Sequence, residues 1–127
     1  MKYLLDTHII LWYFTGSKEL SKAAKSIIED ADTQKYVSIA SFWEFAIKYS
    51  KGKLQFDGGL ACLWEMVSQN GFIILPIEKS HLTDIIQLPF LHRDPFDRLL
   101  VATAQADDMT ILTADENIHK YDVSSVW

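Results

Sequence analysis

The sequence predicts an α/β fold with a short, mainly parallel central sheet. Short apolar segments alternate with longer segments of helical pattern along the chain. The strand-like segments are mostly apolar, as expected when helices cover both faces of a sheet. The chain has 127 residues, of which 49% are apolar and 23% charged, a composition that suits one compact domain over residues 1–127.

The first part of the chain predicts one strand followed by two helices. Residues 2–5 are expected to form a buried strand, and residues 9–14 a helix that ends near Gly16. Residues 21–30 are expected to form the second helix, with Ser21 as its N-cap.

The middle of the chain predicts two more strands and two more helices. Residues 36–39 are expected to form a strand, and residues 41–51 a helix closed by Gly52. A helix over residues 60–69, ended by Asn70 and Gly71, is followed by a strand over residues 72–75 that stops before Pro76.

The last part of the chain predicts two helices and two strands. Ser80 is the expected N-cap of a helix over residues 80–87. Residues 95–106 form a long helix with Pro95 in its first turn and Asp94 as its cap. Residues 110–113 are a fourth strand, and Val123 is the expected start of a fifth.

Two acids stand just past strands, where α/β folds place their ligands. Asp6 follows the first strand directly, and Asp115 lies two residues after the fourth. Each acid also has a purely structural interpretation, because either could cap the helical segment that follows it. Taken singly, the capping interpretation is favoured for both.

Glu44 is the only charged residue between Val37 and Ile47, and Trp43 and Phe45 flank it. A buried carboxylate is costly unless it is paired or coordinates a metal. The alternative is an exposed pair with Lys48 at i,i+4 spacing, which contributes only about 0.3–0.5 kcal/mol. The residues themselves favour neither interpretation.

Asp97 begins a helix that is apolar almost all round. The structural alternative is a capping box, with Asp94 as N-cap and Asp97 three residues later. That alternative leaves unexplained why both arginines of the protein, Arg93 and Arg98, lie in the same short segment.

As a set, Asp6, Glu44, Asp97 and Asp115 predict a metal site. Clustered carboxylates repel one another, and divalent cations relieve that repulsion. Oxygen ligands without a cysteine pair indicate a hard ion, Mg²⁺ or Mn²⁺. Such ions activate water and stabilise a charged phosphate, so hydrolysis of phosphodiester bonds is the expected reaction.

Charge and cysteine content limit where such an enzyme works. The net charge of -5 is unusual for a nucleic-acid binder, but four acids neutralised by cations would leave only -1. Cys62 is the single cysteine, which suggests a reducing, cytoplasmic compartment. No apolar run is long enough for a membrane helix, and no secretory signal is recognisable.

Four segments, in this order and spacing, resemble the PIN-domain ribonucleases, in particular the VapC-type toxins of toxin–antitoxin pairs. The quoted segments are Leu4-Leu-Asp6-Thr-His8-Ile-Ile-Leu-Trp12, Ser38-Ile-Ala-Ser-Phe-Trp-Glu44-Phe-Ala-Ile-Lys48, His92-Arg-Asp-Pro-Phe-Asp97-Arg-Leu-Leu-Val-Ala-Thr-Ala104, and Thr110-Ile-Leu-Thr-Ala-Asp115. The resemblance implies an α/β/α sandwich and a metal-binding acidic site made of Asp6, Glu44, Asp97 and Asp115. It also implies endonucleolytic cleavage of RNA, a homodimer, and a small antitoxin protein as partner.

Several nearby residues have roles that the sequence leaves open. Thr7 and Thr113 could position water or phosphate, and Lys48, Arg93 and Arg98 could contact the RNA backbone or pair with the acids. Asp94 could join the site, although its place before Pro95 favours capping. We expect His8 to be packed rather than catalytic. The four tryptophans are expected in the core or a subunit interface rather than as stacking platforms for bases; they are Trp12, Trp43, Trp64 and Trp127.

Two alternatives to a nuclease come from other functional classes. A phosphoacceptor receiver domain fits the length and the acids at strand ends. That fold needs paired acids after its first strand and a lysine after its last, whereas Thr7 follows Asp6 and no matching lysine is present. The other alternative is a non-catalytic interaction module, in which the acids serve only as caps and surface pairs.

Overall fold

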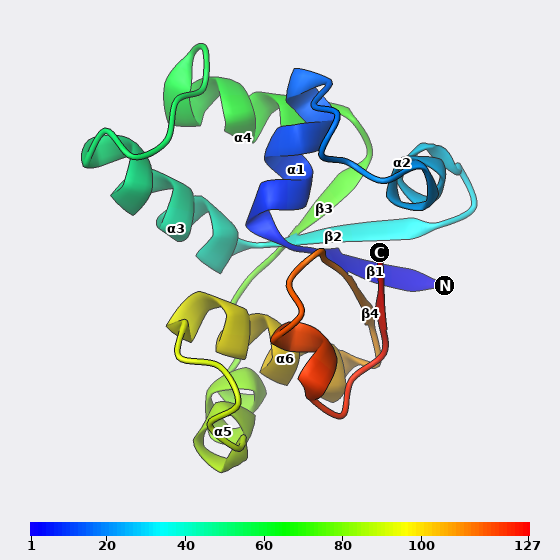
Figure 1. The fold of residues 1–127 in the computed structure, drawn as a ribbon, viewed down its shortest axis with the longest axis vertical. Coiled ribbons are helices and arrows are strands. Elements are labelled where there is room, and N and C mark those ends of the chain that lie inside the picture. The colour runs from blue at the N-terminus through cyan, green and yellow to red at the C-terminus, as the bar shows by residue number, and fades with distance from the viewer.

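The computed structural model describes residues 1–127 and has a single five-stranded sheet with helices on both faces (Figure 1). The strands are β1 (Lys2–Leu5), β2 (Gln34–Ser38), β3 (Phe72–Leu75), β4 (Thr110–Leu112) and β5 (Ser125–Val126). The helices are α1 (Thr7–Thr15), α2 (Lys22–Glu29), α3 (Ile39–Ser50), α4 (Gly59–Gln69), α5 (Lys79–Gln87) and α6 (Pro95–Asp107), with a 3-10 turn η1 (Ile118–Lys120).

All four strand pairings are parallel, and the strand order is β3-β2-β1-β4-β5. The predicted α/β fold with a mainly parallel sheet is therefore confirmed. The chain builds outward from β1 in one direction through β2 and β3, and in the other through β4 and β5. The order reverses between β1 and β4, and the crevice at such a reversal is where open α/β sheets bind ligands.

Two apolar cores lie on opposite faces of the sheet, and alternation along β1 feeds both. Tyr3 and Leu5 pack into the core beneath helices α1 to α4, whereas Leu4 packs into the core beneath α6. Figure 1 shows this division, with α1, α3 and α4 on one side of the strands and α5 and α6 on the other. The two layers fix both walls of the crevice above β1 and β4.

Most predicted elements are present, with boundaries shifted by a few residues. Ser21 caps α2 through its hydroxyl, which accepts the N–H of Ala24 at 3.0 Å. Asp94 caps α6 through its carboxylate. The helix predicted to begin at Ser80 begins at Lys79 instead, so Ser80 is not its cap. Glu78 is the cap residue, and its N–H donates to Nδ1 of the buried His81 at 3.0 Å.

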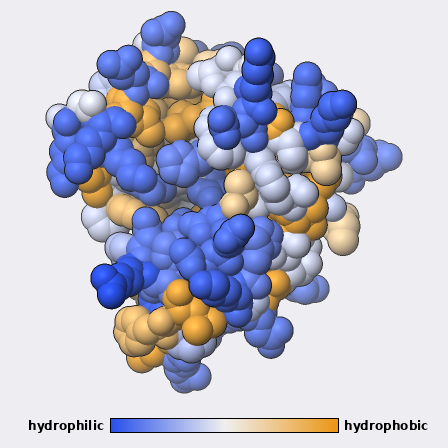
Figure 2. Space-filling view, viewed as in Figure 1, coloured by the Kyte–Doolittle hydropathy of each residue, from blue (hydrophilic) through white to orange (hydrophobic).

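The face of the molecule drawn in Figure 2 carries a group of hydrophilic residues. In Figure 2, hydrophilic residues gather over the middle of the molecule, in the region that Figure 1 assigns to α6 and η1. None of the helices is long and apolar enough to cross a membrane.

Candidate active site

The two central strands bring the first pair of polar side chains together. Asp6 follows β1 and Thr113 follows β4, which is its parallel neighbour. The Thr113 hydroxyl donates to Asp6 Oδ2 at 2.8 Å and accepts the N–H of Asp115 at 3.0 Å. Thr113 is fully buried, so a single hydroxyl links the two acids that the strands deliver. Asp6 precedes α1 but makes no side-chain cap, which removes its structural alternative.

Glu44 lies on the inner side of α3, although its neighbour Trp43 is 61% exposed. The Glu44 side chain is almost wholly buried and accepts a hydrogen bond from Lys48 Nζ at 2.8 Å. The i,i+4 pair weighed as the alternative is therefore present, but it is not a surface pair. An acid is turned inward while an aromatic ring faces solvent, the reverse of ordinary helix patterning.

Asp97 lies in the first turn of α6, and its carboxylate is not used for capping. Asp94 performs that function, because its Oδ1 accepts the N–H groups of Phe96 at 2.8 Å and Asp97 at 3.2 Å. The Asp97 carboxylate instead approaches His92, with Oδ2 at 2.9 Å from Nε2. Asp94 itself also lines the cavity, so capping and proximity to the site are combined in one residue.

His92 links two of the acids. Its Nε2 lies 3.0 Å from Asp115 Oδ2 as well as 2.9 Å from Asp97 Oδ2, and its Nδ1 accepts the N–H of Asp94 at 3.3 Å. Because Nδ1 is an acceptor, the neutral ring carries its proton on Nε2, between the two carboxylates. Asp115 Oδ1 in turn accepts the N–H of Asn117 at 2.8 Å, which orders the loop after β4.

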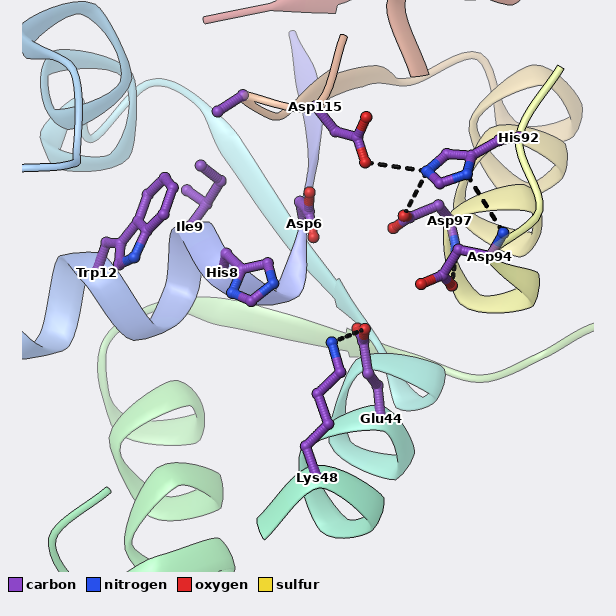
Figure 3. A pocket seen from close by; sticks show the side chains of 11 residues that line it. Asp6, His8, Ile9, Trp12, Glu44, Lys48, His92, Asp94, Asp97 and Asp115 are labelled. Carbon is purple, nitrogen blue, oxygen red and sulfur yellow. Dashed lines mark hydrogen bonds and ion pairs between the residues drawn. The ribbon is translucent and has the colours of Figure 1, made fainter. Parts of the chain in front are cut away.

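The four predicted acids line one cavity of about 330 Å³ (Figure 3). Asp6 comes from the end of β1, Glu44 from α3, Asp97 from α6 and Asp115 from the loop after β4. His8, Trp12, Lys48, His92 and Asp94 complete its polar and aromatic lining. The cavity therefore gathers five carboxylates against one lysine and two histidines.

This excess of negative charge changes proton affinities. Burial, reinforced by the charges of Asp6 and Asp94, raises the pKa of Asp97 to about 9. Burial also raises the pKa of Asp6, against the opposing effect of the Thr113 hydrogen bond. For Asp115, burial acts to raise the pKa, but the hydrogen bonds from His92 and Asn117 and the charge of His92 together outweigh it, so the pKa falls. Without a cation, Asp97 and Asp6 thus keep their protons to higher pH than exposed aspartates do.

The arrangement fits a divalent cation. Carboxylate oxygens from four separate segments face a common space, and their repulsion is only partly balanced by Lys48. Burial acts to lower the pKa of Lys48, but the Glu44 hydrogen bond and the charges of Glu44, Asp94 and Asp97 together raise it. One oxygen of Asp97, one oxygen of Asp115 and a ring nitrogen of His92 lie within 4.8 Å of one another. The two carboxylates could bind a cation there, with His92 beside them as a hydrogen-bond donor. Hard ions such as Mg²⁺ and Mn²⁺ prefer such oxygen-rich sets.

Of the residues predicted to contact the substrate, some lie at the cavity and others do not. Lys48 lines the cavity and pairs with Glu44, and Thr113 orients Asp6. Thr7 is buried, with a hydroxyl that has no hydrogen-bond partner. Arg93 is exposed and does not line the cavity.

The prediction that Arg98 contacts RNA or pairs with the acids is wrong. The side chain is 7% exposed, and both terminal nitrogens are used elsewhere. Nη1 donates to the carbonyl of Pro89 and to the Tyr121 hydroxyl, and Nη2 donates to the carbonyls of Ile85 and Leu88. Arg98 holds the segment after α5 against α6 because no other cation reaches those buried carbonyls.

Sequence reasoning misplaced His8 and missed His92, and of the two places expected for the tryptophans the structure leaves the subunit interface, which stays a prediction. His8 is exposed and lines the cavity instead of packing in the core. None of the tryptophans is fully buried; Trp12 is half-buried, and Trp43, Trp64 and Trp127 are 61%, 40% and 38% exposed. The available signal for His92 was its position five residues before Asp97, in the segment that also holds both arginines.

Comparison with known proteins agrees with this arrangement. Residues 3–124 match the family described as PIN domain. Ribonuclease VapC22 of Mycobacterium tuberculosis is 27% identical over 119 residues, which cover 93% of this chain and 90% of that protein.

Solved structures with the same fold come from toxin–antitoxin complexes. A chain of VapBC2 from Rickettsia felis, solved bound to a DNA fragment from its promoter, superposes with a TM-score of 0.74 at 14% identity, covering 99% of this chain and 98% of that one. A chain of VapBC-1 from nontypeable Haemophilus influenzae gives 0.72 at 14% identity, covering 99% and 97%. At this identity the likeness concerns the fold.

The receiver-domain alternative gains no support from these comparisons, and the family match extends over nearly the whole chain. The protein belongs to the PIN domain family.

Proposed function

We propose that this protein is a metal-dependent endoribonuclease that acts as the toxin of a toxin–antitoxin pair. The observation that carries the proposal is the single cavity lined by Asp6, Glu44, Asp97 and Asp115. The four acids come from four separate segments, and three of them, Asp6, Glu44 and Asp97, are more than 90% buried. Thr113 holds Asp6 and Lys48 holds Glu44, and burying so many carboxylates is costly unless they bind a cation.

The relatives support the same proposal. The curated relative is named a ribonuclease, and the solved structures with this fold include VapBC complexes and a toxin–antitoxin complex from Klebsiella pneumoniae. By analogy we assign RNA as substrate and a small antitoxin protein as partner. A homodimer, a single domain over residues 1–127 and a cytoplasmic site of action complete the proposal.

The proposed mechanism assigns a task to each group in the cavity. A bound Mg²⁺ or Mn²⁺ would activate the attacking water and stabilise negative charge on the phosphate. Asp6, Glu44, Asp97 and Asp115 hold the cation, and Thr113 fixes the orientation of Asp6. Lys48 keeps Glu44 in place and adds a positive charge facing the phosphate. His92 places its Nε2 between Asp97 and Asp115 and so positions both carboxylates, which would hold the cation.

Cleavage of labelled RNA by purified protein, freed of any antitoxin, tests the proposal. We expect endonucleolytic products with Mg²⁺ or Mn²⁺, and none with a chelator. Asp6→Asn and Asp97→Asn should each abolish cleavage, whereas Asp57→Asn, an exposed acid outside the cavity, should not. Cleavage that survived both chelation and the two cavity substitutions would falsify the proposal.

A non-catalytic interaction module remains the second hypothesis. It predicts that the cavity acids can be neutralised without loss of function, because their role would be structural. Retained antitoxin binding by an Asp97→Asn variant that has lost RNA cleavage would separate catalysis from interaction and favour the nuclease. Absence of any cleavage by wild-type protein with either metal would favour the module.

A further inference from the structure

One wall of the acidic cavity is aromatic. His8 and Trp12 stand one turn apart on α1, with ring centroids 5.9 Å apart and planes inclined by 29°, so the two rings are stacked. Trp127 continues the row, with its ring centroid 5.8 Å from that of Trp12. We call His8 and Trp12 the aromatic wall. Their rings form a short platform that begins beside the acids and leads away from them.

The aromatic wall and the acids share the same space. His8, Ile9 and Trp12 line the cavity together with Asp6 and Glu44. Figure 3 shows the two rings along α1, across the cavity from His92 and Asp97. A ligand whose phosphate reached the acids would therefore have its neighbouring atoms beside the aromatic rings.

Core packing accounts for only part of this wall, because Trp12 packs against the core with part of its surface and His8 does not belong to the core. His8 is exposed, and Trp12 keeps partial exposure, although Ile9 and Ile10 on the same helix are fully buried. An exposed histidine stacked on a half-buried indole gains little from burial. Both rings instead present apolar area to a cavity whose remaining lining is mostly charged.

We propose that the aromatic wall is a stacking subsite for the nucleobase next to the phosphodiester bond that is cleaved. Base–aromatic stacking is the usual means by which proteins hold single-stranded nucleic acid, and it tolerates any base because each has a π-face. A base can lie against Trp12 only when it is unstacked from its own strand. The substrate class is therefore RNA that is unpaired at the cleavage position. This inference rests on the proposed ribonuclease activity and deepens it.

Binding of short single-stranded oligoribonucleotides with one base removed at a time tests the subsite. Asp97→Asn protein in Mg²⁺ serves as the cleavage-deficient background, with affinity followed by fluorescence anisotropy of end-labelled RNA. We expect one position at which removal of the base weakens binding by about 5- to 150-fold, the range found for loss of one stacked base. Combining Asp97→Asn with Trp12→Ala should weaken binding of the intact RNA and abolish the effect of base removal at that position alone.

Matched variants separate stacking from folding. Trp12→Phe keeps a smaller ring and should retain part of the position-specific effect. His8→Ala alters an exposed side chain, so it should fold normally and still reduce that effect. Trp64→Ala removes a partly exposed indole that contacts Phe42 outside the cavity, and it should leave the pattern unchanged. Circular dichroism melts verify that each variant is folded.

The outcomes separate this inference from the proposed function. If removal of the base weakened binding equally with and without the Trp12 ring, the subsite would be overturned. It would also be overturned if paired and unpaired RNA bound with equal affinity, both to the unsubstituted protein and to folded His8→Ala protein. Cleavage of RNA by the wild-type protein would then still stand. Conversely, a wild-type protein that neither binds nor cleaves RNA refutes the proposed function and the subsite with it.

Discussion

At the scale of single residues, Asp97 carries the sharpest electrostatic consequence. Its pKa is raised from 3.8 to about 9 in the metal-free protein, first by burial and then by the neighbouring acids. The folded state thus binds the Asp97 proton more tightly than the unfolded chain does between these two values. Stability must fall as pH rises through that window, because the folded protein progressively loses a proton that it holds strongly.

We therefore predict that the metal-free protein melts at a lower temperature at about pH 8 than at about pH 5. Asp97→Asn removes the titrating group and should flatten this dependence and raise the melting temperature at about pH 8. Mg²⁺ should stabilise the wild type at that pH, because the cation replaces the proton. Thermal melts in chelator and in Mg²⁺ measure these effects, with Asp57→Asn as the control. Equal pH slopes for wild type and Asp97→Asn would contradict the prediction.

The sequence was informative about acids but not about their partners. Glu44 could be singled out because it is isolated among apolar residues, and burial of that acid is what the structure shows. His92 could not be found in this manner, since its importance depends on Asp97 and Asp115 meeting across two different segments. Arg98 misled for the opposite reason. A cation near an acid in the sequence suggests pairing, but the Arg98 guanidinium donates to the carbonyls of Pro89 and Ile85 instead.

At the scale of elements, that arginine joins α5 to α6. Arg98 donates to the carbonyl of Ile85 at the end of α5 and to those of Leu88 and Pro89 just after it. The Ile85 and Pro89 carbonyls also accept the N–H groups of Leu88 and Leu91. Its guanidinium also lies 4.1 Å from the centroid of the Phe90 ring. The start of α6, which carries Asp97, is thus tied to a loop that has little other packing.

We predict that Arg98→Ala lowers the free energy of unfolding by about 2 to 4 kcal/mol, because the Leu88 carbonyl loses its side-chain donor and several hydrogen bonds of a buried guanidinium are lost. Arg93→Ala should change stability little, since that side chain is exposed. Urea denaturation of both variants measures the difference. If Arg98→Ala protein were as stable as wild type yet bound RNA poorly, Arg98 would have to be reassigned to substrate contact.

Element types could be predicted from the sequence more accurately than element ends. The alternation of apolar strands and helices was sufficient for the parallel sheet. The start of α5 was misjudged because serine is a common cap, whereas here His81 accepts the N–H of Glu78 and is held in place by Asp107 at 2.8 Å from its Nε2. That arrangement depends on the far end of α6 and has no local signature.

At the scale of the whole molecule, a net charge of -5 coexists with a proposed RNA substrate. Five of the acids face a single cavity, so much of the negative charge is concentrated where cations are expected to bind. The sequence predicted a mainly parallel sheet but not the order of its strands. The reversal between β1 and β4, which determines that Asp6 and Thr113 meet, depends on pairing between distant segments.

If the protein is a toxin, its expression without antitoxin should arrest bacterial growth. Glu44→Gln should relieve the arrest, because it removes one charge from the cation site while keeping the shape of the side chain. Glu65→Gln, an exposed acid on α4, should arrest growth as the wild type does. Growth curves with matched protein levels by immunoblot provide the measurement. Arrest by Glu44→Gln protein at wild-type strength would argue against a catalytic toxin.

The hydrogen bond between Thr113 and Asp6 joins residues 107 positions apart, and this separation matters while the chain is being made. Asp6 leaves the ribosome early, but β4 and Asp115 follow only near the end of translation. At about 5 to 20 residues per second, the nascent chain spends roughly 5 to 20 seconds without a complete set of acids. Each new molecule therefore completes its acidic cavity only when its synthesis is nearly finished.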